Sequence, residues 1–389
     1  MTKAMTSRQR VQATLDHREP DRVPLGIWST LDGYKRLRSY LGLPIAEQYP
    51  VGSTTWSRDV PVEFDVIDKL GLDVIRVCGR CPGGKSLEKT PDGLWIDEWS
   101  VKRKLVEHPS GTYLEIVNPP LKDATVDDLA DYPWPDPSDP AVWEGLEERV
   151  KRLYDETDLA ILAQFGRGGI FEQAKYLRGY DTIMYDMAAN PEFVIALFDK
   201  LTEVEMKFNE IGIGLIGQYI NILRLSPEDL ATGDSTFVSP KMFERMLRPY
   251  YKRSFSLARK LLKEKNPQAR LQFHSCGAVY PLLNALIEDG MEIFDPLQPR
   301  VAEGSRPARL KQAFGDRIAF WGGIDVQVTL PRGTKEEIAK EVRTRIAEVA
   351  PGGGYILSSS HRIQPDIPPE NVVAMYEAAK EHGEYPIKA

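Results

Sequence analysis

Residues 273–279 read FHSCGAV, which places a histidine and a cysteine two positions apart at the end of an apolar run. On an extended segment, side chains two residues apart point to the same side. Imidazole nitrogen and thiolate sulfur suit Zn²⁺, which keeps one coordination position open in catalytic sites. His274 and Cys276 are therefore a candidate metal pair, although a free cysteine is also often simply packed in a core.

Three other residues are candidates to complete such a site. His361, in the stretch SSSHRIQPD, is one of only five histidines in the chain. Cys78 and Cys81 form a C-x-x-C, a spacing that is found in redox motifs and in half of a zinc site. The sequence has no second C-x-x-C. The alternative interpretation is that Cys78 ends a buried strand and that Cys81 has no chemical role.

Short apolar, β-branched runs alternate along the chain with longer segments of helical periodicity, which is typical of βα units and a parallel sheet. Helices are predicted between these runs, for example over 191–212 and over 334–350, where Thr334 and Glu337 form a capping box. The predicted strands cover residues 22–28, 72–78, 159–165, 219–225, 270–274, 291–296, 317–322 and 354–359.

Eight strands with interleaved helices predict an α/β fold, a single (β/α)8 TIM barrel that forms one domain over residues 1–389. A doubly wound open sheet is the alternative. The barrel is preferred because no G-x-G-x-x-G opens a helix after the first strand. Residues 94–117 alternate polar and apolar side chains around Pro-Ser-Gly, which predicts a β-hairpin inserted after the second strand.

In such a barrel, functional side chains lie where strands end and the following loops begin. His274 and Cys276 end the fifth predicted strand, Glu172 follows the third, Asp325 the seventh and His361 the eighth. Asp325, Glu172 and His361 are the predicted acid–base or orienting groups. The predicted substrate contacts are Arg167 after the third strand, Trp28 at the end of the first and Asp295 at the end of the sixth.

Composition excludes several classes of function. The chain of 389 residues has a formal net charge of −7, which argues against non-specific nucleic-acid binding. It has neither an apolar core of signal-peptide length at its start nor a run of about 18 apolar residues, so we expect no membrane span. Three cysteines do not make a secreted disulfide framework. A cytoplasmic protein is the simplest expectation.

Several stretches together resemble the uroporphyrinogen decarboxylase superfamily: FHSCGAVYPLLNALIEDGMEIFDPLQP, RIAFWGGIDV, GGGYILSSSHRIQPDIPPENV and LSPEDLATGDSTFVSPKMFERMLRPYYK. The resemblance covers nearly the whole chain and implies a single (β/α)8 barrel. True decarboxylases of this superfamily carry an arginine-rich RQAGRYLPEY segment after the first strand. The corresponding region here reads GIWSTLDGYKRLRSYLGL, which does not match it.

The chain is more similar to the second branch, the corrinoid-dependent methyltransferases, which includes methylcobalamin:coenzyme M methyltransferases. That resemblance implies a zinc ion bound by the H-x-C of His274 and Cys276, with His361 in place of a distant cysteine. It also implies a corrinoid such as methylcobalamin. Because no D-x-H-x-x-G stretch occurs, the corrinoid would arrive on a separate partner protein.

The leading hypothesis is therefore zinc-assisted transfer of a methyl group between a small molecule and a corrinoid. A second hypothesis is decarboxylation of uroporphyrinogen or another acidic substrate without a metal, and a third is a non-catalytic protein that binds a corrinoid or small ligand. The expected partners are a small-molecule methyl donor or acceptor and a corrinoid protein. A homodimer is compatible with the sequence.

Overall fold

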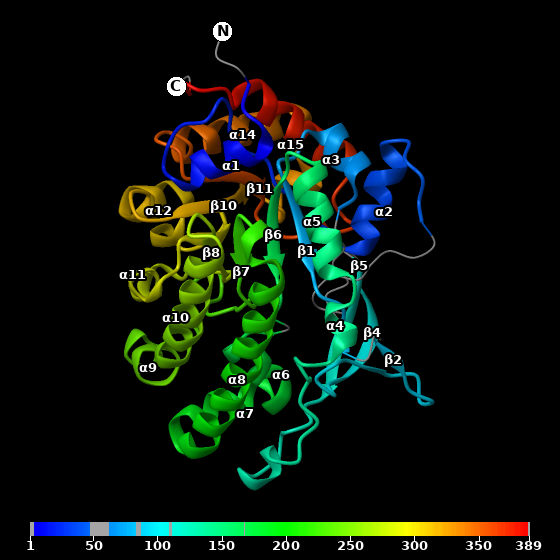
Figure 1. Ribbon diagram of the computed structural model, residues 1–389, viewed down its shortest axis with the longest axis vertical. Helices are drawn as coiled ribbons and strands as arrows, with labels where there is room; N and C mark the ends of the chain where they lie inside the picture. Colours follow the sequence, from blue (N-terminus) through cyan, green and yellow to red (C-terminus); the bar gives the residue numbers. More distant parts are fainter. Residues whose placement is uncertain (1–3, 47–61, 83–86, 109–110, 167, 388–389) are drawn as a thin grey trace.

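The computed structural model of the protein describes residues 4–46, 62–82, 87–108, 111–166 and 168–387. Seven of the eight predicted strands form one curled parallel sheet, whose neighbours follow the order of the chain (Figure 1). Each carries a short, buried, apolar stretch of the kind that parallel sheets require. These strands are β1 (Val74–Cys78), β6 (Ala160–Gln164), β7 (Ile222–Arg224), β8 (Arg270–His274), β9 (Ile293–Leu297), β10 (Ala319–Ile324) and β11 (Tyr355–Ser359).

The first predicted strand, 22–28, lies between β11 and the start of β1 without forming a regular ladder. Leu25 makes an isolated parallel bridge to Leu357, and the Gly26 N–H donates to the Leu357 carbonyl at 2.9 Å. On the other side, the Asp73 N–H donates to the Leu25 carbonyl at 2.9 Å. Pro24 has no N–H to donate, which limits regular pairing here. The result is a TIM-barrel-like arrangement.

Residues 94–117, predicted as one hairpin, belong to a larger four-stranded antiparallel sheet between β1 and β6 in the chain. Its neighbours are β2 (Glu88–Lys89), β3 (Trp95–Ile96), β4 (Lys102–His108) and β5 (Gly111–Asn118), in that order. The two additional short strands fit the principle that an isolated two-stranded hairpin is only marginally stable in water. Figure 1 shows this sheet on the right of the view, below helix α1 (Ser7–Leu15).

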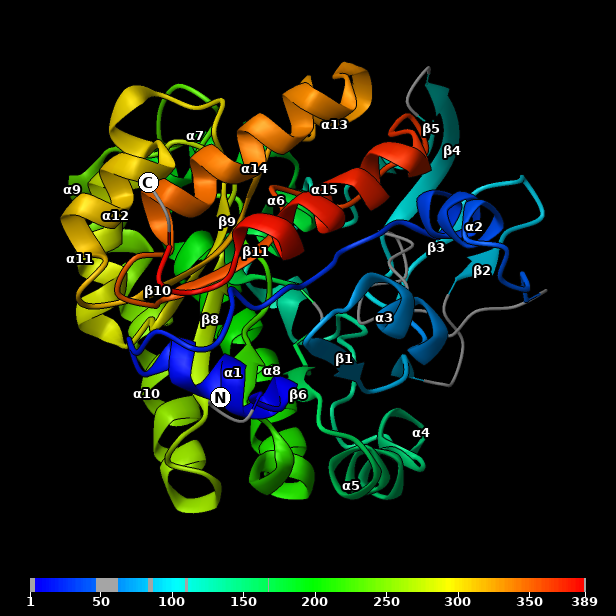
Figure 2. The ribbon, with the colours of Figure 1, turned by 90° about the horizontal axis from the view of Figure 1, so that it is seen from above.

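Helices follow the strands and pack around the parallel sheet (Figures 1 and 2). Pro249 lies in the first turn of α10, just after the end of α9, a position that tolerates its missing N–H. The remaining helices are α2 (Leu31–Tyr40), α3 (Phe64–Leu70), α4 (Pro140–Trp143), α5 (Leu146–Glu156), α6 (Ile170–Arg178), α7 (Tyr180–Ala189), α8 (Pro191–Ile216), α9 (Pro240–Met246), α10 (Arg248–Lys265), α11 (Tyr280–Asp289), α12 (Pro307–Phe314), α13 (Thr329–Arg332), α14 (Lys335–Val349) and α15 (Pro369–His382).

The apolar core has two parts. A large cluster joins residues of the strands to the surrounding helices. A second, smaller cluster contains alternate strand residues such as Leu162, Ile222 and Trp321 together with Val11 and Leu15 of α1. Helix α1 contacts β1, β6 and β11, and Figure 2 shows it next to β6. It therefore closes the amino end of the sheet, which leaves the carboxyl end for the site. Among the described helices, none combines the length and apolar character needed to cross a membrane.

Candidate metal centre

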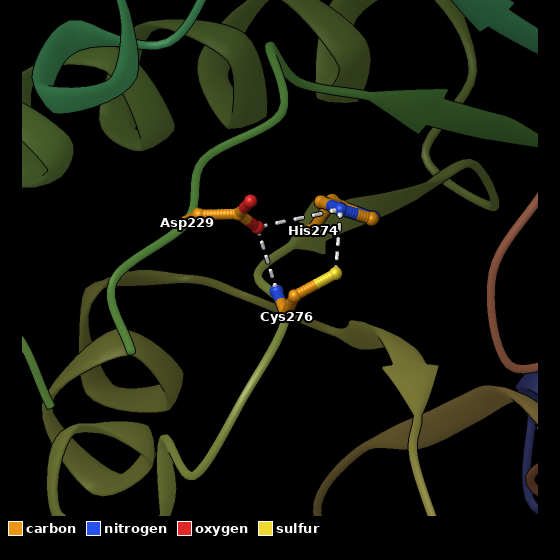
Figure 3. A group of neighbouring side chains, drawn as sticks. All are labelled: Asp229, His274 and Cys276. Atoms are coloured by element: carbon orange, nitrogen blue, oxygen red, sulfur yellow. Dashed lines mark hydrogen bonds and ion pairs between the residues drawn. The ribbon is translucent and has the colours of Figure 1, made fainter. Parts of the chain in front are cut away.

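Three potential metal ligands meet at the carboxyl end of β8 (Figure 3). His274 ends β8, Cys276 follows two positions later, and Asp229 lies in the loop after β7. One ligand atom from each residue lies within 4.8 Å of the other two. His274 Nε2 is 3.6 Å from Cys276 Sγ and 3.9 Å from Asp229 Oδ1. The Cys276 N–H donates to Asp229 Oδ1 at 3.0 Å, which fixes the carboxylate beside the pair.

Asp295 orients the His274 ring. The two residues are partners in the register of β8 and β9, and His274 Nδ1 lies 2.8 Å from Asp295 Oδ2. Arg224 Nη2 donates to the same oxygen at 3.0 Å. Burial acts to raise the pKa of Asp295, but His274 and Arg224 hold that pKa below its ordinary value. The ionised carboxylate favours a proton on Nδ1, which leaves the Nε2 lone pair directed toward Cys276 and Asp229.

The loop that carries Asp229 is fixed from several directions. The Glu228 N–H donates to the His274 carbonyl at 3.1 Å, which extends the pairing of β7 and β8 into the loops. The Glu228 carboxylate accepts the N–H groups of Phe171 and Glu172 at the start of α6, at 3.1 and 2.7 Å. Lys175 Nζ donates to the Asp229 carbonyl at 2.9 Å. The backbone of the third candidate ligand is therefore tied to β8 and to α6.

The thiol of Cys276 has a pKa well above its usual range. Burial is the main cause, and the negative charges of Asp229 and Asp295 act in the same direction, whereas Arg362 opposes them. Without a cation the sulfur is therefore a neutral thiol. A bound divalent cation favours the thiolate, because a coordinating thiol loses its proton.

The donor set fits Zn²⁺. A histidine nitrogen, a cysteine sulfur and a carboxylate oxygen are the three ligand types that zinc accepts, and three protein ligands leave the fourth position for a substrate. The carboxylate that holds His274 Nδ1 is the usual outer partner of a zinc-bound histidine. Here that partner is Asp295, which is itself hydrogen-bonded to Arg224.

His361, the predicted third ligand, lies near the centre but outside this three-residue group. Its ring centroid is 6.5 Å from that of His274. The next residue, Arg362, is close enough to act on the pKa of Cys276. The loop after β11 therefore faces the centre, and a ligand role for His361 stays a prediction.

Three of the other predicted residues lie close to the centre. Glu172 is buried, accepts a hydrogen bond from Tyr176 and forms an ion pair with Lys175 at 2.5 Å. It therefore adjoins Asp229 through Lys175. Trp28 is buried, and the guanidinium of Arg224, which also binds Asp295, lies 4.5 Å from its ring centroid. Asp295, predicted as a substrate contact, is buried and engaged with His274 and Arg224, so its geometry is that of a positioning residue.

Asp325 shapes the loop after β10. It accepts N–H groups from Gln327, Val328 and Thr329 and pairs with Arg300 Nε at 2.6 Å, which are the contacts of a loop-capping carboxylate. The predicted alternatives Cys78 and Cys81 are both buried. Among the described residues, the group of potential metal ligands contains neither cysteine. Arg167, predicted as a substrate contact, lies outside the described residues.

Asp229 is the residue that the sequence analysis missed. It stands in the stretch LSPEDLATGD, directly after the fourth predicted strand. The strand-end rule that selected His274 and Asp325 also applies to this strand. Applied there, it would have pointed to Glu228 and Asp229.

The curled parallel sheet is TIM-barrel-like, and the candidate metal ligands lie at its carboxyl end, where barrels of this class carry their active sites. The family model "Uroporphyrinogen decarboxylase (URO-D)" matches residues 106–382, and the chain belongs to this family. The uroporphyrinogen decarboxylase of Geobacter metallireducens is 27% identical over 276 residues, which cover 69% of this chain and 75% of that protein. The enzyme of that name from Legionella pneumophila (strain Corby) is 39% identical over 74 residues, 19% of this chain and 20% of its own length.

A solved structure shares the whole fold. The methyltransferase from Methanosarcina mazei superposes with a TM-score of 0.64 over 97% of this chain and 99% of that one, with 18% sequence identity. At this identity the likeness concerns the fold. It covers nearly the full length of both chains, and it therefore supports the TIM-barrel-like architecture.

Proposed function

We propose that this chain is a zinc-assisted methyltransferase that moves a methyl group between a small substrate and a corrinoid carried on a separate protein. The observation that carries the proposal is the convergence of His274, Cys276 and Asp229 within 4.8 Å, with His274 Nδ1 held by Asp295. The name of the Methanosarcina mazei neighbour is consistent with this activity. The curated relatives are named decarboxylases, which keeps decarboxylation as the alternative.

The chain's own residues have distinct tasks in this proposal. His274, Cys276 and Asp229 hold the zinc ion, which when bound supplies a Lewis acid that polarises a thiol, hydroxyl or ether group of the substrate. Asp295 and Arg224 fix the ring of His274. Lys175 holds the Asp229 backbone in place. In this proposal His361, whose ring centroid lies 6.5 Å from that of His274, completes the ligand set or contacts the substrate.

The zinc content of the purified protein tests the metal part. We expect one zinc per chain in the wild type and at least a tenfold loss of affinity in His274→Ala, Cys276→Ala and Asp229→Asn. Matched controls are Cys78→Ala, which changes a buried cysteine outside the group, and His382→Ala in α15. Both should keep the metal. The zinc affinity of His361→Ala decides whether that histidine is a further ligand, because loss of a ligand lowers this affinity.

Two results would overturn the proposal. If the wild-type protein lacks stoichiometric zinc after reconstitution, the proposed zinc site is wrong. Formation of coproporphyrinogen from uroporphyrinogen would instead establish the decarboxylase, and we expect none because the arginine-rich segment is absent from the sequence. Methyl transfer is followed by the change in corrinoid absorbance when methylcobalamin is mixed with a panel of acceptors.

A further inference from the structure

A cavity of about 770 Å³ lies beside the candidate metal centre. Its walls come from β5, from the region where α6 meets α7, and from the loop after β11. Leu114 and Ile116 contribute from β5, and Tyr176 and Tyr180 contribute from the two helices. The antiparallel sheet β2–β5 therefore builds one side of a space whose other sides belong to the barrel.

The cavity adjoins the metal centre through two of its lining residues. Lys175 lines the cavity, and its Nζ donates to the Asp229 carbonyl at 2.9 Å. Arg362 also lines the cavity, and it directly follows His361, whose ring centroid lies 6.5 Å from that of His274. The cavity therefore extends from β5 to residues that adjoin the candidate metal centre, although the three candidate ligands themselves do not line it.

Two of the three basic residues that line the cavity, Lys175 and Arg103, are paired with acidic side chains. Lys175 pairs with Glu172 at 2.5 Å, and Arg103 Nε pairs with the fully buried Asp97 at 2.8 Å. Both cations also lie against aromatic rings, Lys175 over Tyr180 and Arg103 over Tyr176. Much of the surface offered to a ligand is therefore aromatic and aliphatic, which favours an uncharged body with a flat ring.

We infer that the cavity binds the body of an uncharged, ring-bearing substrate, and that the heteroatom of this substrate faces His274, Cys276 and Asp229. The volume lies within the range of about 300–1,000 Å³ that encloses ligands of drug size, so a two-carbon thiol would leave most of it empty. The inference rests on the proposed function for the role of the bound molecule and narrows its substrate to a ring-bearing class. Binding itself requires neither zinc nor corrinoid.

The test is a fluorescence titration of the full chain with 2-methoxynaphthalene, a neutral two-ring methyl ether. We expect saturable binding to the wild type, both with zinc bound and after zinc has been removed by a chelator. Ile116→Trp, which fills the cavity, should weaken binding at least tenfold. The matched control is Val117→Trp, because the neighbouring residue on β5 is exposed and does not line the cavity. It should bind as the wild type does.

A second pair of variants tests the inference independently, in case Ile116→Trp does not fold. Tyr180 is 47% exposed and lines the cavity, whereas Tyr185 in the same helix is 70% exposed and does not line it. Tyr180→Ala should weaken binding several-fold, and Tyr185→Ala should leave it unchanged. Failure of the wild type to bind saturably, or binding by Ile116→Trp and Tyr180→Ala that equals the wild type, would overturn the inference.

Charged and small competitors separate this inference from its alternatives. Tenfold tighter binding of 6-methoxy-2-naphthoate would show an anion site and would contradict the uncharged class. Displacement of the probe by millimolar 2-mercaptoethanol would favour a small thiol and would also contradict it. Zinc content is measured on the same samples, so loss of the metal part and loss of the ring-binding part are distinguishable.

Discussion

The two ends of the parallel sheet each bury an aspartate, but they use it differently. At the amino end, fully buried Asp73 accepts from Ser7, Arg10, Arg22 and the N–H of Leu25. At the carboxyl end, Asp295 holds His274 and Arg224. The first carboxylate ties α1 and the entry segment to β1, whereas the second positions a candidate ligand. Asp73 therefore stabilises the fold, and Asp295 positions a residue of the candidate metal centre.

The surroundings of the two carboxylates differ in the same way. Among the described residues near Asp295, the indole nitrogens of Trp28 and Trp321 and both polar atoms of the Gln272 side chain are buried without a hydrogen-bond partner. Buried polar atoms in native proteins are normally satisfied, and exceptions call for water or a ligand. No described side chain that binds Asp73 has such an unsatisfied atom, whereas Arg224, which binds Asp295, has one at Nε.

Asp73→Asn should produce the largest effect. It leaves Arg10 and Arg22 without their shared buried carboxylate, and removal of one partner from a buried ion pair costs about 3–5 kcal/mol. Urea denaturation should show this loss in the free energy of unfolding, and zinc content should stay unchanged. Asp155→Asn, which removes an exposed partner of Lys151, is the control and should change stability by less than about 0.5 kcal/mol. Equal effects of the two variants would refute the assignment.

Glu205→Gln should stabilise the protein at alkaline pH. Burial raises the pKa of Glu205 to about 7 from its ordinary value of 4.5, against the opposing hydrogen bonds of Ser226. Between these values the unfolded chain releases the proton that the folded chain keeps, so wild-type stability falls as pH rises through this window. Above about pH 8 the free energy of unfolding of the neutral variant should exceed that of the wild type by on the order of 3 kcal/mol.

The same Glu205→Gln comparison at low pH is its own control. Below the ordinary carboxyl pKa of 4.5 both states of the wild type hold the proton, so the advantage of the variant should vanish. Denaturation curves of both proteins across this range measure the difference. An advantage that does not depend on pH would show that Glu205 is not neutral in the folded protein.

Asp295→Asn should lower zinc affinity by about 10–100-fold, as expected when the carboxylate partner of a metal-bound histidine is lost. This corresponds to about 1.4–2.7 kcal/mol of binding free energy. Competition with a chelator measures it. Asp325→Asn is the matched control, since that carboxylate caps the loop after β10. If Asp325→Asn lowers zinc affinity as much as Asp295→Asn does, the division of roles between the two aspartates is wrong.

Ser7→Ala should have the smallest effect, a loss of about 1 kcal/mol in the free energy of unfolding. Ser7 Oγ donates one hydrogen bond to Asp73 at 2.8 Å, and the arginines and Leu25 still satisfy this carboxylate in the variant. Thermal unfolding detects a change of this size. No change in zinc affinity is expected. A measurable change would show that the two ends of the sheet are energetically coupled.

The sequence by itself determined the parallel strands and the His274–Cys276 pair. Short buried β-branched runs specify strands locally, and β8 coincides with the predicted segment 270–274. The two-residue spacing of histidine and cysteine needs no tertiary information to put both on one side. The extent of the inserted sheet was underestimated, because β2 and β3 are two-residue strands that carry no periodicity of their own.

Only the tertiary structure decided which of the remaining polar residues are candidate ligands and which position other residues. Asp229, Asp295, Asp325 and His361 all lie at or just after the ends of predicted strands, and their residue types are equally suited to a site. The register of β8 with β9 places Asp295 on His274 Nδ1, and the bridge between Glu228 and Ser275 brings Asp229 beside Cys276. These placements depend on pairing between segments distant in sequence, which local residue patterns do not encode.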